Sequence, residues 1–162
     1  MIVQNLIECY VNEKSTKAIL KYKKEVVDYF YQKLLEQKEK YKIFIAGKSN
    51  VMKSIYELEI ERIEFLLREY LIIRLEKMKE DYYIDLNLLS SQEVVYYTRL
   101  QKIAPFKNKK NDKIEVIGFL CKKDLGNVIL DDENVEMCKD DFFVGPLNDV
   151  YDLIINEDIK LV

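Results

Sequence analysis

From Asn50 to about Tyr83 the sequence contains neither glycine nor proline, and this stretch constrains the fold more than any other feature. Its apolar residues recur three and four positions apart, which predicts one continuous α-helix. At 1.5 Å per residue, some thirty residues make a rod of roughly 45 to 50 Å. The apolar arc of this helix is wider than one intramolecular face needs. We therefore expect either the spine of a helical bundle or a helix that offers a second face to another protein.

Three charged residues of this helix, Glu59, Arg62 and Arg74, are expected toward the apolar arc. A charge in such surroundings must be paired or hydrogen-bonded. The pattern leaves open whether the partners come from the same chain or from another subunit. The candidates for helix packing or subunit contact on this helix are Glu59, Arg62, Phe65, Leu66, Tyr70, Ile73, Arg74 and Met78.

The remaining pattern predicts two unlike parts. Helices are expected at about 4–12 and 23–41, with Asn50 capping the long helix, and Ser90 with Glu93 forms a capping box for a fourth helix that Pro105 stops. Residues 105–113 are polar and basic, which favours a linker. From 114 onward the apolar period becomes two, with a short helix at about 148–155 and a break at Gly145-Pro146. The expected fold is α+β: a helical domain (1–104), a linker (105–113) and a small, mostly antiparallel β domain (114–162).

Charge divides the chain at the same place. Residues 1–113 carry 22 basic and 17 acidic side chains, whereas residues 114–162 carry 4 basic and 12 acidic ones. Both parts are rich enough in apolar residues to fold. The boundary near residue 113 therefore separates a helical domain from an acidic β appendage of about 50 residues, which is marginal alone and would gain from docking on another surface.

The composition excludes many kinds of enzyme. The chain has no histidine, so it lacks the usual general base, the usual nitrogen ligand for zinc or iron, and any Ser-His or Cys-His nucleophile pair. Its three cysteines, Cys9, Cys121 and Cys138, have no metal-ligand spacing and are expected to be free thiols. We predict no catalytic residues, no cofactor, no metal and no membrane span.

Several strings resemble one family, the GINS proteins of eukaryotic DNA replication, and within it the Sld-five type of subunit. Residues 59–78, EIERIEFLLREYLIIRLEKM, are similar to the family run E-x-E-R-I/L-x-F/Y-x-x-x-x-Y-x-x-x-R-L-x-K-I. The strings LIE and NEK near the start, LSSQE at 89–93, and the closing helix and strand at 149–162 also resemble family patterns. The resemblance covers nearly the whole chain.

The resemblance implies a non-catalytic scaffold in the nucleus. In that family four paralogous subunits pack their long helices into a tetramer, which joins Cdc-forty-five and the MCM ring as the replicative helicase. The implied partners are therefore three sister subunits, the MCM ring and Cdc-forty-five, with a replicative polymerase as a further candidate. Contact with DNA is expected to be indirect or weak.

Two alternatives stay open at this stage. The string KDLG at 123–126 is similar to the β domain of the sister Psf-one subunit, which makes that subunit type the alternative within the same complex. From another class comes a nucleic-acid-binding module, whose basic cluster would be Lys107, Lys109, Lys110 and Lys113. Lysines bind phosphate without sequence preference, but Phe106 is the one aromatic residue beside them and the net charge of −3 opposes the idea.

Overall fold

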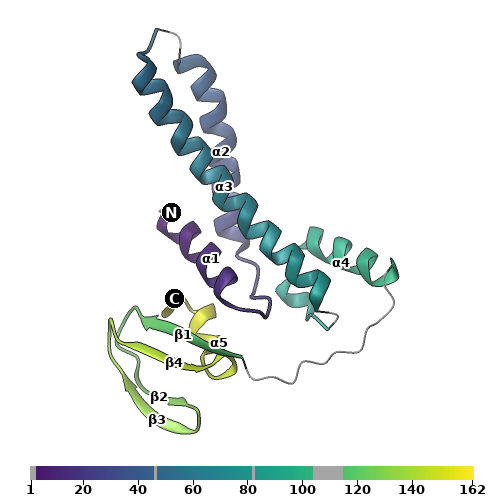
Figure 1. Ribbon diagram of the computed structural model, residues 1–162, viewed down its shortest axis with the longest axis vertical. Coiled ribbons are helices and arrows are strands. Elements are labelled where there is room, and N and C mark those ends of the chain that lie inside the picture. Colours follow the sequence, from purple (N-terminus) through teal and green to yellow (C-terminus); the bar gives the residue numbers. More distant parts are fainter. Residues whose placement is uncertain (1–2, 46, 82, 104–114) are drawn as a thin grey trace.

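A computed structural model of the chain describes residues 3–45, 47–81, 83–103 and 115–162 (Figure 1). Helices come first: α1 (Val3–Ser15), α2 (Lys24–Phe44), α3 (Asn50–Glu80), a short 3-10 helix η1 (Leu86–Leu88) and α4 (Ser91–Ile103). Strands with one helix follow: β1 (Val116–Cys121), β2 (Gly126–Leu130), β3 (Glu133–Met137), β4 (Phe142–Pro146), α5 (Leu147–Ile155) and β5 (Ile159–Leu161). The predicted α+β fold, with a long helix in its helical part and a small antiparallel β part, is confirmed.

The two longest helices, α2 and α3, run side by side as an antiparallel hairpin, and its outer end extends beyond the rest of the molecule (Figure 1). Their apolar residues meet each other and α1 in one core, and Tyr70 and Phe30 are almost fully buried there. The buried members of this core are Leu6, Cys9, Val26, Val27, Phe30, Leu34, Leu66, Leu67 and Tyr70. Helix α1 packs against the C-terminal half of α3. The end of the hairpin near the turn at Gly47 therefore has fewer neighbours.

The hairpin turn explains where α3 begins. Gly47 has a φ of 81°, a conformation that glycine adopts at little cost, and it lies just after the end of α2. Ser49 is the N-cap of α3, because its side chain accepts a hydrogen bond from the backbone N–H of Met52. The prediction that Asn50 caps this helix is therefore wrong by one residue. The helix ends at Glu80, because the following Asp81 has an extended backbone.

The start of α4 agrees with the sequence. The backbone N–H of Ser90 donates to Glu93 Oε2 at 2.7 Å, and the N–H of Glu93 donates to Ser90 Oγ at 3.3 Å, which confirms the predicted capping box. Met78, Ile84 and Tyr97 form a small core here with Ile19. The predicted stop at Pro105 and the linker 105–113 lie outside the described residues.

The β part contains a three-stranded sheet in the order β4-β1-β5 and a hairpin of β2 and β3, with all pairs antiparallel. Gly145 and Pro146 belong to β4 and pair with Ile117 and Val116, so the prediction that they break the sheet is wrong. Pro146 lies at the end of an edge strand, where a missing N–H is tolerated, and it is also the N-cap of α5.

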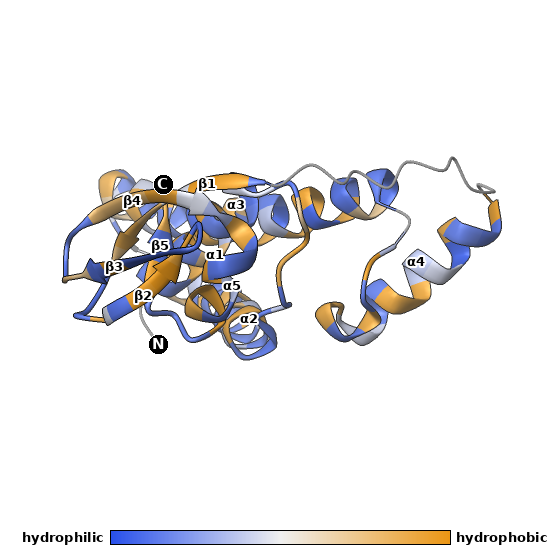
Figure 2. Ribbon diagram, turned by 90° about the horizontal axis from the view of Figure 1, so that it is seen from below, coloured by the Kyte–Doolittle hydropathy of each residue, from blue (hydrophilic) through white to orange (hydrophobic). Residues whose placement is uncertain are grey.

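The β part packs on the helical part of the same chain. Leu20, from the segment between α1 and α2, is a buried member of the β core. The Glu115 carboxylate accepts hydrogen bonds from the backbone N–H groups of Lys17 and Ala18, and Asn12 of α1 accepts one from Leu161 N–H at 3.0 Å. Seen from below, the strands and α5 lie beside α1, whereas α4 projects at the other end (Figure 2). The small β core thus gains a docking surface within its own chain.

Candidate interaction surface on the long helix

The inner face of α3 carries charges that are buried among apolar side chains. Its buried residues are Leu66, Leu67, Tyr70, Arg74, Lys77 and Met78. Arg74 is 0% exposed, and it lies one helical turn beyond Tyr70. A cation in such a place is stable only if every donor finds a partner.

Arg74 finds those partners on four other segments: α1, the connection between α1 and α2, η1 and α4. Its Nε and Nη2 donate to the Glu93 carboxylate of α4 at 2.7 and 3.2 Å, and its Nη1 donates to Glu13 Oε2 of α1 at 2.9 Å. Nη1 and Nη2 also donate to the backbone carbonyls of Leu20 and Leu88, at 2.7 and 3.0 Å. The contact with Glu93 is bidentate, and this geometry makes arginine suitable for buried ion pairs. Arg74 therefore fastens α1, α3 and α4 together.

Lys77 completes the cluster one turn further along α3. Its ammonium donates to Glu13 Oε1 at 2.8 Å, to the Ala18 carbonyl at 2.8 Å and to Thr16 Oγ1 at 3.0 Å. Glu13 therefore bridges Arg74 and Lys77, and the four side chains of the cluster, Arg74, Lys77, Glu13 and Glu93, carry no net charge. We call these four residues the buried charge cluster.

The environment shifts the pKa of both cations, in opposite directions. Burial lowers the pKa of Lys77, and Glu13 offsets only part of that effect. Burial also opposes the charge on Arg74, but the hydrogen bonds and charge of Glu93, with the charge of Glu13, outweigh it and raise the pKa of Arg74. Arg74 is thus the permanently charged centre of the cluster.

Tyr70 lies between this cluster and the helical core. Burial raises the pKa of its phenol, and its hydroxyl accepts a hydrogen bond from the backbone N–H of Lys23 at 3.4 Å. Its ring centroid lies 5.6 Å from the guanidinium carbon of Arg74, which is within cation–π range. Tyr70 thereby links the start of α2 to α3.

The other candidates on α3 lie elsewhere. Leu66 and Met78 are buried and Ile73 is half-buried, whereas Phe65 is exposed. The side chains of Glu59 and Arg62 are 61% and 55% exposed and approach each other at 4.0 Å. Both side chains are thus largely exposed in the chain alone, and the expectation that they pair with groups of another subunit stays a prediction.

The sequence analysis did not predict that Glu13, Lys77 and Glu93 belong to a charge cluster. Lys77 follows Arg74 by three positions and so shares its helix face, which is a signal that the sequence contains. Glu13 is distant in sequence and had no such signal. For Glu93 the sequence pattern predicted a helix-capping role, and no contact with Arg74.

The outer face of α3 carries a second row of residues, exposed on the side opposite the core. We call this row the outer seam, and its positions alternate in spacing by four and three residues: Val51, Ile55, Leu58, Arg62, Phe65, Glu69, Ile72 and Glu76. The five apolar members are exposed by 72%, 54%, 62%, 46% and 38% in chain order. Leu58, Arg62 and Phe65 also border a shallow hollow in the surface. Exposed apolar surface of this kind is typical of interaction sites, which makes the outer seam a candidate.

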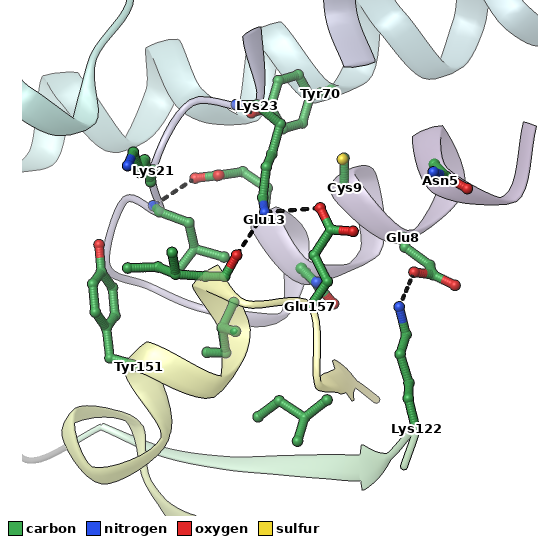
Figure 3. A pocket seen from close by; sticks show the side chains of 15 residues that line it. Asn5, Glu8, Cys9, Glu13, Lys21, Lys23, Tyr70, Lys122, Tyr151 and Glu157 are labelled. Carbon is green, nitrogen blue, oxygen red and sulfur yellow. Dashed lines mark hydrogen bonds and ion pairs between the residues drawn. The ribbon is translucent and has the colours of Figure 1, made fainter. Parts of the chain in front are cut away.

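A small cavity lies at the junction of α1 with the β part (Figure 3). It measures about 30 Å³, room for one or two water molecules. Four of the charged groups around it form two ion pairs, Lys122 with Glu8 and Lys23 with Glu157. This arrangement holds the two parts together and provides little space for a substrate.

Among the described residues no group of three or more His, Cys, Asp or Glu side chains is placed to hold a metal ion. No described helix combines the length and apolar character that crossing a bilayer requires. The basic cluster Lys107, Lys109, Lys110 and Lys113, on which the nucleic-acid-binding alternative depends, lies outside the described residues.

Comparison with known proteins gives a consistent result. No family model matches the chain. A DNA replication complex GINS protein SLD5 of Arabidopsis thaliana is 32% identical over 104 residues, which are 60% of this chain and 47% of that protein. The protein of the same description from Dictyostelium discoideum is 25% identical over 173 residues, covering 85% of this chain and 81% of its own length. The one from Bos taurus is 33% identical over 79 residues, 49% of this chain and 34% of its own.

The chain is similar to SLD5-type GINS proteins. The matched part spans about half the length of the Arabidopsis relative. Four curated matches carry the SLD5 description, which agrees with the resemblance of residues 59–78 to the Sld-five pattern. The SLD5-type assignment is therefore preferred over the Psf-one type.

Proposed function

We propose that the chain is a non-catalytic scaffold subunit of a GINS complex, assembled with three sister subunits. The exposed outer seam is the observation that carries this proposal. Five large apolar side chains along one edge of α3 are exposed to water in the chain alone, and burying them against another protein would be favourable by about 25 cal/mol per Å² of apolar surface. The buried charge cluster ties the C-terminal part of α3 to α1 and α4 within the chain, on a face that the outer seam does not use.

The finer parts of the proposal follow from the relatives' names together with the family resemblance. The assembled complex would join the MCM ring and Cdc-forty-five, with a replicative polymerase as a further partner, and it would act in the nucleus during DNA replication. The domain division at about residue 113 belongs to the same proposal, with the helical part for assembly and the acidic β part docked on it.

Co-expression tests the assembly directly. The chain is produced with the three other GINS subunits of the same organism, and size exclusion is expected to yield one complex with equal amounts of all four. Phe65→Asp should release the chain from the complex, because it places a charge in the outer seam. Glu64→Asp, at an exposed neighbouring position, is the matched control and should leave the complex intact. A wild-type chain that elutes as a monomer beside its sisters would contradict the proposal.

Association with the helicase is tested separately. The tagged complex is purified from replicating cells, and the MCM ring and Cdc-forty-five are expected to co-purify with it. Fluorescent tagging of the same chain should show it in the nucleus. Recovery of the GINS subunits without either helicase component would limit the function to the complex itself.

A further inference from the structure

The outer seam repeats every seven residues in two parallel rows. Val51, Leu58, Phe65 and Ile72 form an entirely apolar row, and the second row consists of Ile55, Arg62, Glu69 and Glu76. Alternate spacing by three and four is the arrangement through which one helix packs knobs into the holes of another. The apolar row extends over about 32 Å at 1.5 Å per residue, the length of six helical turns.

We infer that the outer seam binds an amphipathic helix of an unlike chain. That helix carries an apolar residue opposite each member of the apolar row, an acidic residue opposite Arg62, and basic residues opposite Glu69 and Glu76. The inference rests on the proposed function, because the helix would come from a sister subunit, and it adds the chemical pattern by which that helix is selected.

The charged members of the seam are available for such pairing. Arg62 contacts Glu59 at 4.0 Å, and Glu69 contacts its neighbour Arg68 at 3.5 Å. These are loose ion pairs between partly or largely exposed side chains, and pairs of this kind contribute little to stability. Arg62 and Glu69 can therefore exchange them for contacts across an interface at small cost. The buried cluster around Arg74 is different, since its ion pairs are enclosed within the chain.

A second copy of this chain is a poor occupant of the seam. In a parallel pair, Arg62 would face Arg62, and Glu69 and Glu76 would face their own copies, which places like charges together. In an antiparallel pair, the row with Arg62 and Glu69 would lie against the apolar row, so that charges would be buried beside groups such as Phe65 without partners. Both arrangements are disfavoured, whereas an unlike helix can satisfy all three charges. Such a pattern selects partners by repulsion as well as by attraction.

The experiment uses the complex co-expressed with the three other GINS subunits. A photoreactive phenylalanine analogue replaces Leu58 in the seam, or the exposed Lys40 of α2 as the control position outside the seam. Irradiation is expected to link position 58, and not position 40, to a helix of one sister subunit, and mass spectrometry identifies the linked residue. An acidic residue on that helix, at the position opposite Arg62, is then the expected charge partner.

Charge reversal completes the test. Arg62→Glu is expected to weaken assembly about tenfold or more, and changing the partner's acidic residue to arginine should restore it. Lys40→Glu, which makes the same change of charge at an exposed position of α2 outside the seam, should have no effect. If the wild-type subunits fail to assemble, the proposed function and this inference both fail. If they assemble but position 58 links to a second copy or to nothing, or Arg62→Glu assembles normally, the inference is wrong while the proposed function stands.

Discussion

Removing the Arg74 guanidinium tests whether the buried charge cluster holds the helical part together. Arg74→Met keeps most of the apolar stem and removes three hydrogen bonds to carboxylates and two to backbone carbonyls. Glu13 keeps Lys77 as a partner, but Glu93 keeps only the N–H of Ser90. Losing one partner of a buried ion pair costs about 3–5 kcal/mol. We expect a loss of that size, a large part of the ~5–15 kcal/mol that stabilises a typical domain.

The assay is urea unfolding followed by helical circular dichroism at 222 nm. Adding Glu93→Gln to Arg74→Met should recover part of the loss, because the uncompensated charge is then gone.

Arg68→Met is the matched control, since the Arg68 side chain is 60% exposed. Its effect should stay within about 0.5 kcal/mol, as for most surface substitutions. A loss below about 1 kcal/mol for Arg74→Met would refute the reasoning that this cation compensates two buried carboxylates.

Four further predictions concern local features. Ser49→Ala should cost about 0.5–1 kcal/mol in urea unfolding and Asn50→Ala clearly less, because Ser49 is the N-cap of α3; equal losses would contradict this. Gly145→Ala should cost about 1–3 kcal/mol, since its new Cβ would lie 2.4 Å from a leucine methyl group of β2; an unchanged midpoint would contradict that contact. Alkylation of the native chain should modify the exposed Cys138 quickly and the buried Cys9 only on unfolding. Because burial raises the pKa of Cys9 from 9.0 to about 11, the unfolded chain loses this proton first, and about 2–3 kcal/mol of stability should disappear between pH 9 and 11. The loss of stability between pH 9 and 11 should be smaller in Cys9→Ala than in the unchanged chain.

Sequence periodicity predicted the elements well because it reports local geometry. The long helix, the capping box of Ser90 and Glu93, and the change to period two after the basic stretch each depend on residues a few positions apart. The errors occurred where neighbours distant in sequence decide the outcome. Gly145 and Pro146 stay in a strand because β1 pairs with them.

The candidate residues on α3 show the same limit. Periodicity indicated that α3 has more apolar surface than one face needs, but not how the helix is rotated against α1 and α2. That rotation buries Arg74 and exposes Arg62, although both were placed on the same arc. Glu13 is a partner of Arg74 because α1 packs against α3, and the sequence spacing does not indicate that packing.

Side-chain footprinting of the outer seam tests the central claim most directly. Hydroxyl radicals oxidise exposed aromatic and aliphatic side chains, so the rates at Phe65 and Leu58 are compared between the isolated chain and the co-expressed GINS complex. We predict that both residues react readily in the isolated chain and are protected at least several-fold in the complex, whereas the exposed Ile129 of the β part reacts alike in both. Equal oxidation of Phe65 and Leu58 in the two samples would contradict the claim that α3 uses this face for assembly.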